Sequence, residues 1–280
     1  MKKISIVVLL VLIQAFMFGC TAARTPQPTP EPTLTQTVQP TATATVPSGP
    51  ARLQFIGHDC FLLTAGDGTR ILMDPYRTAY VPIDISTFPP NLTADLVTMS
   101  QLHPDHSGIR EVAGNPRGMY QAGVNHIGAV TITGYTTDQA YFDGSPAGGS
   151  GMTIAVTVFV LETGGVKIVH MGAAGVIAQD DILAAIENAD VAIIDAMGTD
   201  SHPVPEMMAQ LRKSHVRTVI PAHNSFHEND RFYGALTVEE FVKMLTPDEM
   251  VTRASGSEIT VTPGMPVQVL VLTPSALAAQ

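Results

Sequence analysis

The residues best suited to chemistry in this chain of 280 residues lie in the stretch TMSQLHPDHSG, residues 98–108. It places His103, Asp105 and His106 within four consecutive positions, directly after the apolar run DLVTMS. A loop that follows a strand is fixed at its root by that strand, so its side chains can converge on one point. Imidazole and carboxylate groups together suit zinc or a similar divalent ion. The spacing therefore predicts a metal-binding loop.

The elements that must position this loop are short strands, followed by an alternation of helices and strands. Acidic first turns and apolar periodicity predict helices at 180–189, 205–214 and 237–245, the last opened by a capping box of Thr237 and Glu240. Short apolar runs bounded by turn residues predict the strands. These are residues 52–57, 60–65, 70–75, 95–100, 129–133, 152–161, 166–171, 190–195, 216–223, 258–262 and 267–272.

The N-terminal region predicts export from the cytoplasm. Two lysines precede an apolar segment that is short for a membrane span, so residues 1–19 are expected to be a signal peptide. Its end, Gly19-Cys20, resembles a bacterial lipobox, and Cys20 is expected to carry a lipid. The alternative is a plain signal peptide with a chance cysteine. The expected location is extracytoplasmic, with the lipid anchored in the bacterial cell membrane at the cell surface or in the periplasm.

Composition separates a tether from a folded domain. Residues 20–50 are mostly Thr, Pro, Ala and Gln, which cannot bury a core and predict an extended tether. Residues 51–280 are long enough for one domain with a proper core, in which Cys60 is expected to be a buried free thiol. The net charge of −10 becomes −12 when residues 1–19 and their two lysines are removed. This acidic balance argues against a nucleic-acid partner.

Further motifs follow in an order that resembles the metallo-β-lactamase-fold hydrolases, nearest to the branch of the L-ascorbate-6-phosphate lactonases. The matching segments are 55–63 (FIGHDCFLL), 71–76 (ILMDPY), 94–108 (ADLVTMSQLHPDHSG), 140–149 (AYFDGSPAGG), 164–175 (GGVKIVHMGAAG) and 219–225 (VIPAHNS). The resemblance implies an α/β fold, an αββα sandwich of two mixed β-sheets with helices on the outer faces.

The resemblance also implies one set of metal ligands. Asp105, His106 and His223 stand at the positions that hold the second metal ion in this family. Three such ligands leave an open position for water, as in a catalytic zinc site. His103 is then expected to contact the substrate or to move a proton beside Asp105. His58, at a Gly-His turn, could line the pocket, although a surface histidine is the alternative.

Three ligand positions of the family hold other residues in this chain. Gln101 and Phe142 replace histidines of the first metal ion, and Ala173 replaces the aspartate that bridges both ions. We therefore expect the dinuclear site to be lost, leaving one divalent ion, with zinc favoured, or none. Asp74 is expected to hydrogen-bond backbone near the metal loop, and His170 to be a buried strand histidine.

Two functional hypotheses follow from these ligand positions. The first is a membrane-tethered hydrolase of an ester, lactone or phosphoester bond that acts on a small molecule through at most one metal ion. The second is a non-catalytic surface lipoprotein that keeps the fold and binds a ligand or partner in its pocket. Phe142 and Ala173 favour the second, because they offer no group to orient a hydroxide.

Overall fold

The computed structural model describes residues 49–81, 88–140, 153–199, 202–226 and 234–276. The chain divides into two compact units, Met1–Ala44 and Thr45–Gln280, and all the described residues belong to the second. The predicted signal peptide, Cys20 and nearly all of the predicted tether lie outside the described residues. The helices in the described part of the chain are too short or too polar to cross a membrane.

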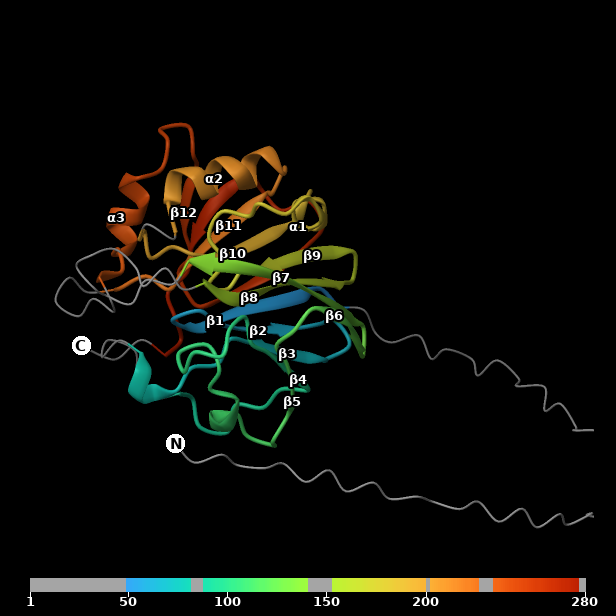
Figure 1. The fold of residues 1–280 in the computed structure, drawn as a ribbon. Helices are drawn as coiled ribbons and strands as arrows, with labels where there is room; N and C mark the ends of the chain where they lie inside the picture. The colour runs from blue at the N-terminus through green and yellow to red at the C-terminus, as the bar shows by residue number, and fades with distance from the viewer. Residues whose placement is uncertain (1–48, 82–87, 141–152, 200–201, 227–233, 277–280) are drawn as a thin grey trace, which may run out of the picture. The chain divides into compact units, whose positions relative to one another are not determined.

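The smaller of two mixed sheets has the strand order β13-β1-β2-β3-β4-β5 (Figure 1). Its first four strands in this order pair antiparallel, whereas β3, β4 and β5 run parallel. The strands are β1 (Ala51–Gly57), β2 (Cys60–Thr64), β3 (Arg70–Met73), β4 (Leu96–Thr98), β5 (Arg117–Met119) and β13 (Glu258–Val261).

The larger sheet has the order β12-β14-β11-β10-β9-β8-β7-β6. The strands β6 to β9 pair antiparallel, and the strands from β9 to β12 in this order pair parallel. The strands are β6 (Gly123–Ile127), β7 (Val130–Ala140), β8 (Thr153–Thr163), β9 (Val166–His170), β10 (Val191–Asp195), β11 (Thr218–Ala222), β12 (Val251–Arg253) and β14 (Gln268–Val271).

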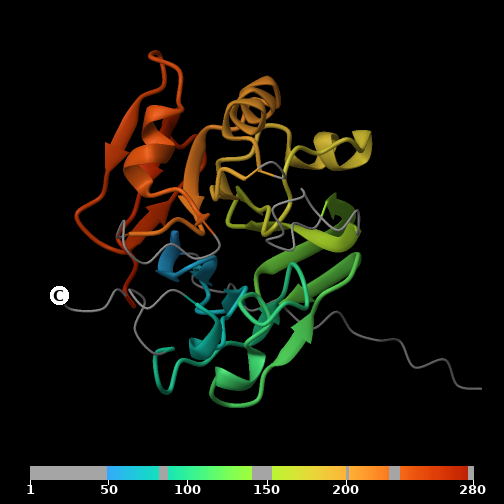
Figure 2. The same ribbon diagram turned by 60° about the vertical axis from the view of Figure 1, so that its left-hand side comes forward.

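The alternation of side chains along each strand builds two apolar layers on the larger sheet. On β8, Phe159 and Leu161 point into the core between the two sheets, whereas Val158 and Val160 point to the other face. That outer face is covered by the helices α1 (Asp180–Ile186), α2 (Val204–Lys213) and α3 (Val238–Lys243). Figure 2 shows the yellow α1 and the orange α2 on this same side of the sheet.

The outer face of the smaller sheet has a different cover. Tyr76, Phe88 and Val112 pack there, on loops that include the 3-10 helices η1 (Thr78–Tyr80) and η2 (Ile109–Glu111). The predicted sandwich of two mixed sheets is thus confirmed. Within the described residues, however, its α-helices cover only the larger sheet, because long apolar loop segments bury the outer face of the smaller one.

Most elements agree with the sequence-based prediction. All eleven predicted strands are present, and the capping box of Thr237 and Glu240 is confirmed. The helix predicted to extend to residue 189 ends at Ile186. The strands β5, β6 and β12 were not predicted, because most of their side chains are exposed and their sequences carry no continuous apolar run. Cys60 is a buried free thiol, as expected.

One edge of the sandwich collects the ends of several strands. The parallel strands β3 and β4 end there, as do β9, β10 and β11, so the loops after them come together. A backbone hydrogen bond of 2.8 Å from the His223 amide to the His58 carbonyl joins the two sheets at this edge. This edge therefore positions the functional residues.

Candidate metal centre

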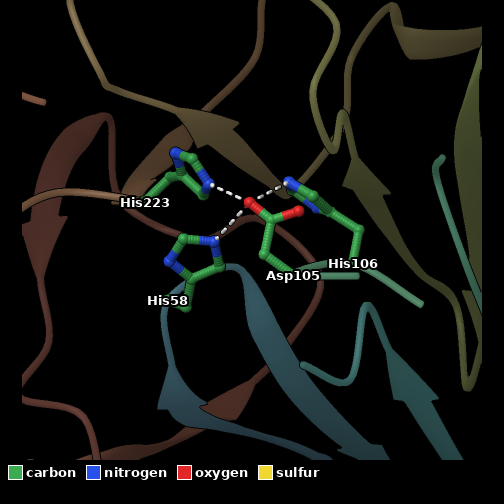
Figure 3. Close-up of side chains that lie close together, drawn as sticks. All are labelled: His58, Asp105, His106 and His223. Atoms are coloured by element: carbon green, nitrogen blue, oxygen red, sulfur yellow. Dashed lines mark hydrogen bonds and ion pairs between the residues drawn. The ribbon is translucent and has the colours of Figure 1, made fainter. Parts of the chain in front are cut away.

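Four buried side chains, His58, Asp105, His106 and His223, form what we call the first cluster (Figure 3). Each offers one ligand atom, and these four atoms lie within 4.8 Å of one another. His58 comes from the turn between β1 and β2, Asp105 and His106 from the loop after β4, and His223 from the end of β11. Both sheets therefore contribute to the cluster.

The three imidazoles point their Nε2 atoms at one carboxylate oxygen, Oδ2 of Asp105. The distances from this oxygen are 3.1 Å to His58, 3.4 Å to His223 and 3.7 Å to His106. His103 contacts the other oxygen, Oδ1, through its Nδ1 atom. A carboxylate and several imidazole nitrogens that face one point are the donor set that zinc prefers.

The backbone is held in an uncommon conformation where it carries these groups. His58, Asp74 and His223 have φ values of 58°, 42° and 61°, in the left-handed region that residues other than glycine rarely adopt. A register shift in the pairing of β1 with β2, between Phe55 and Gly57, directly precedes His58. Such an irregularity re-aims the side chains that follow it, which brings His58 inward.

The histidines of the first cluster differ in protonation. Burial lowers the pKa of His58 to about 3, helped by the neighbouring charge of His223, so His58 is neutral at pH 7. Burial also opposes a charge on His106, but Asp105 and Asp74 overcome it and raise the pKa of His106 to about 10. Burial works against the charge of Asp105 as well, yet His106 and His103 hold its pKa well below the usual range.

Hydrogen bonds behind the cluster orient its imidazoles. The Nδ1 atom of His106 lies 2.7 Å from Oδ2 of Asp74, to which it donates, so Nε2 is left to face Asp105. Asp74 is itself fixed by the Ser100 amide, which donates to Oδ1 over 2.6 Å, and by the Ser100 hydroxyl. On the other side, Nδ1 of His223 lies 3.4 Å from a carboxylate oxygen of Asp195.

Asp59, Asp74 and His170 form a second cluster of buried donors. His170 Nε2 lies 3.5 Å from an Asp59 carboxylate oxygen and hydrogen-bonds the Asp59 carbonyl at 3.2 Å. Both carboxylate oxygens of Asp59 are buried and have no hydrogen-bond partner in the described part of the chain. Burial raises the pKa of this carboxyl group, although His170 opposes the rise. A buried carboxylate whose imidazole neighbours lie as far as 3.5 Å away is a group that a cation would satisfy better.

His106 connects the two clusters. Its Nε2 atom faces Asp105 of the first cluster, while its Nδ1 atom lies 2.7 Å from Asp74 and 3.5 Å from Asp59 of the second. The clusters are therefore neighbours that share one imidazole ring between them.

Comparison with known proteins agrees with this arrangement. The family model of the β-lactamase superfamily domain matches residues 52–223, a stretch that contains every member of both clusters. The chain is a member of the metallo-β-lactamase superfamily.

Two relatives of this metallo-β-lactamase superfamily member are described as metal-dependent hydrolases. A UPF0173 metal-dependent hydrolase of Natranaerobius thermophilus is 24% identical over 186 residues, which are 61% of this chain and 82% of the relative. Another from Methanosarcina mazei is 24% identical over 207 residues, 62% of this chain and 84% of the relative.

Solved structures of the superfamily agree in fold. A protein of Thermotoga maritima, described as a candidate zinc-dependent hydrolase, has a TM-score of 0.60 at 26% identity and covers 79% of this chain and 98% of that one. A metallo hydrolase from Ignicoccus hospitalis has a TM-score of 0.50 at 16% identity, over 70% of this chain and 90% of that one, which shows the fold alone.

The prediction that this chain has lost the superfamily's dinuclear site is wrong. It rested on Gln101, Phe142 and Ala173, which carry no metal-binding side chain at three positions where the family has ligands. The structure nevertheless contains two buried sets of donors, because Asp59, Asp74 and His170 form a second set beside the first. The expectation of at most one metal ion is wrong for the same reason.

The residues that led to this expectation lie as follows. Gln101 is half-buried and belongs to neither cluster. Ala173 is buried, and its carbonyl lies 3.0 Å from Nε2 of His202. Phe142 lies outside the described residues. His103 is not a member of the first cluster, but it contacts Oδ1 of Asp105, and its side chain is 33% exposed.

The structure also places residues that the sequence left ambiguous or unnoticed. His58 is buried within the first cluster rather than exposed in a surface turn. Asp195 accepts a turn hydrogen bond from the Met197 amide and also approaches both His223 and His202. Asp59 was not predicted at all. One sequence signal was available: Asp59 is a charged residue directly between His58 and the apolar run of β2.

Proposed function

We propose that this chain is a metal-dependent hydrolase that attacks an ester, lactone or phosphoester bond of a small molecule. The observation that carries the proposal is the first cluster, in which three imidazoles and one carboxylate converge while buried. The names of the relatives, metal-dependent hydrolases, support the same conclusion. We further propose that the second cluster holds a second divalent ion.

The residues fit such ions by an independent criterion. The buried Asp59 carboxylate has only long contacts of 3.5 Å to Nε2 of His170 and Nδ1 of His106 within the described residues, so a cation beside it would improve its solvation. Asp74 and His170 supply two further donors beside it. In the first cluster, the neutral His58 and the ionised Asp105 are already in the forms that bind a metal.

Each side chain then has a distinct task. A divalent ion held by the first cluster would supply Lewis-acid chemistry and would lower the pKa of water near it. Asp105, His106 and His223 would hold the ion, and Asp74 keeps the proton of His106 on the Nδ1 side. His103 lies against Asp105 with a third of its side chain exposed, so it is placed to move a proton to or from the substrate.

We also propose that the protein is extracytoplasmic and anchored to the bacterial cell membrane through lipid on Cys20. The support is the sequence alone, a signal-like segment that ends in Gly19-Cys20 and is followed by a Thr/Pro-rich stretch. Wild-type chain is expected in the membrane pellet after cell fractionation, and a Cys20→Ser variant in the soluble or secreted fraction. Pelleting of Cys20→Ser to the same extent would refute the lipid anchor.

The test of the hydrolase proposal is metal content joined to activity. The full chain is purified without chelator or polyhistidine tag, and zinc, manganese and iron are counted by elemental analysis. Three variants accompany it: Asp105→Asn in the first cluster, Asp59→Asn in the second, and the exposed Asp248→Asn as matched control. Ester, lactone and phosphodiester substrates are then assayed before and after chelation.

We expect about two ions per wild-type chain and per Asp248→Asn chain, because the donors come in two sets. Asp59→Asn should keep the ion of the first cluster, whereas Asp105→Asn should lose that ion and all hydrolysis. Wild-type protein that is folded, binds no ion at micromolar zinc and hydrolyses none of the substrates would rule the proposal out.

A further inference from the structure

A cavity of about 490 Å³ lies beside the metal loop and belongs to neither cluster. Its walls come from three places: the start of the metal loop, the turn before β6, and the paired strands β7 and β8. We call it the amide pocket, after the two carboxamide side chains among its lining residues. The lining residues used below are Gln101, Leu102, Tyr120, Gln121, Thr136 and Thr157.

The pocket is linked directly to the metal centre. Ser100 also lines it, and the amide of Ser100 donates to Asp74 over 2.6 Å while Asp74 binds His106. The carbonyl of Ser100 accepts a hydrogen bond of 2.7 Å from the amide of Thr157 on the opposite wall. A molecule in the pocket would therefore lie against the same loop that carries the catalytic side chains.

The chemistry of the lining is uncharged but rich in hydrogen-bonding groups. None of the described residues that line the pocket is acidic, basic or a histidine. Gln101 and Gln121 both line it, and neither carboxamide has a hydrogen-bond partner within the described part of the chain. Each carboxamide can donate and accept, so both are available to a ligand.

The rim adds apolar surface. Leu102 is 65% exposed and Tyr120 is 46% exposed, which is unusual for such large side chains, and both line the pocket. An aromatic ring and an aliphatic side chain next to two carboxamides suit a ligand with an apolar face and polar, uncharged edges. The described lining residues offer a carboxylate or phosphate no cationic side chain to offset the water it would give up on contact.

We propose that the amide pocket is the substrate subsite, and that it selects an uncharged, hydrogen-bonding group over an anionic one. Gln101 stands where the family has a metal ligand, but in this chain its carboxamide hydrogen-bonds the substrate. Gln121 and Tyr120 determine specificity with it. This inference rests on the proposed hydrolase function, because it names the class of substrate for that same site.

The test compares three 4-nitrophenyl esters that differ only at the far end of the acyl chain. Adipamate ends in a carboxamide, hydrogen adipate in a carboxylate and hexanoate in a methyl group. The zinc-loaded full chain should hydrolyse adipamate with a kcat/KM at least about tenfold above that for adipate. Gln121→Lys should narrow this ratio about fivefold or more, whereas Gln54→Lys on β1, outside the pocket, should leave it unchanged.

A binding measurement separates this inference from the proposed function. Adipamide and the adipate dianion are titrated separately into the isotope-labelled, zinc-loaded protein, and the amide signals of Tyr120 and Gln121 are followed by NMR. Signal shifts with adipamide but not with adipate support the subsite, even if no ester is hydrolysed. The absence of ester hydrolysis would count against the hydrolase proposal only. Equal hydrolysis of all three esters, or adipate binding as well as adipamide, overturns the subsite and leaves the hydrolase standing.

Discussion

Replacing Asp105 by Asn should destabilise the metal-free protein in a way that depends on pH. The carboxylate faces three imidazoles, and with Asp74 it keeps His106 protonated inside the fold. Asn has nearly the same shape and can still hydrogen-bond, so packing is preserved while the charge is removed. The variant therefore isolates the electrostatic part of the contribution.

The size of the effect follows from the pKa of His106. A rise from 6.5 to about 10 corresponds to about 5 kcal/mol of stability. Asp105, Asp74 and Asp59 share this contribution, with Asp105 the first among them, so the variant should lose about 2 to 3 kcal/mol near pH 6. Because the pKa of His106 is higher in the folded than in the unfolded protein, its stabilising contribution is complete below pH 6.5. The contribution disappears as the pH rises through 10.

The assay is urea unfolding of chelator-treated wild type, Asp105→Asn and the exposed control Asp248→Asn at pH 6 and pH 9.5. The difference between wild type and Asp105→Asn should be about 2 to 3 kcal/mol at pH 6 and much smaller, or reversed, at pH 9.5. Asp248→Asn should match wild type at both values. A difference for Asp105→Asn that is equal at both pH values would show that the carboxylate acts through packing and would refute this reasoning.

Three further predictions concern the loop, the protons and a helix. Gly172→Ala should cost about 2 to 4 kcal/mol in thermal or urea unfolding, because the new Cβ would lie 2.1 Å from that of Ser100, whereas Gly164→Ala, with a similar positive φ and open space, should cost much less. Zinc binding at pH 7 should release at least one proton, because His106 must lose its charge before it can bind the ion. Calorimetry in two buffers of different ionisation enthalpy measures the number of protons released, and a value of zero would contradict the prediction. Thr237→Ala should lower stability by about 1 kcal/mol through loss of the capping box, and Thr237→Ser should retain most of it.

Most strands could be predicted from the sequence because they are apolar runs between turn residues, whereas the two-sheet sandwich followed from the resemblance to the metallo-β-lactamase-fold hydrolases. Where that signal is weak, as in β6 (Gly123–Ile127) with mostly exposed side chains, the strand exists only because β7 pairs with it. Tertiary pairing of this kind leaves no local pattern to read. Helices on both outer faces were expected from the resemblance, whereas loop residues such as Tyr76 and Phe88 cover the smaller sheet here.

The site was predictable where its residues are adjacent in sequence and hidden where they are not. Asp105 and His106 share one loop, so their spacing alone indicates a metal site. Asp59 and His170 are 111 positions apart in the sequence, and the packing of the two sheets against each other brings them together. Asp59 does not stand at any of the family's ligand positions, so the three replaced ligands suggested a loss although a second cluster is present.

His106 explains why those losses need not disable the centre. An imidazole has two nitrogens on opposite sides of the ring, and here one faces Asp105 while the other faces Asp74 and Asp59. The family links its two metal positions through a carboxylate at the place of Ala173, whereas this chain links its two clusters through a ring. Asp74 fixes which nitrogen of His106 carries the proton. A change in the second cluster should therefore alter the orientation and protonation of His106 Nε2, the atom that faces the first cluster. The two clusters are thus coupled through the orientation and protonation of one side chain.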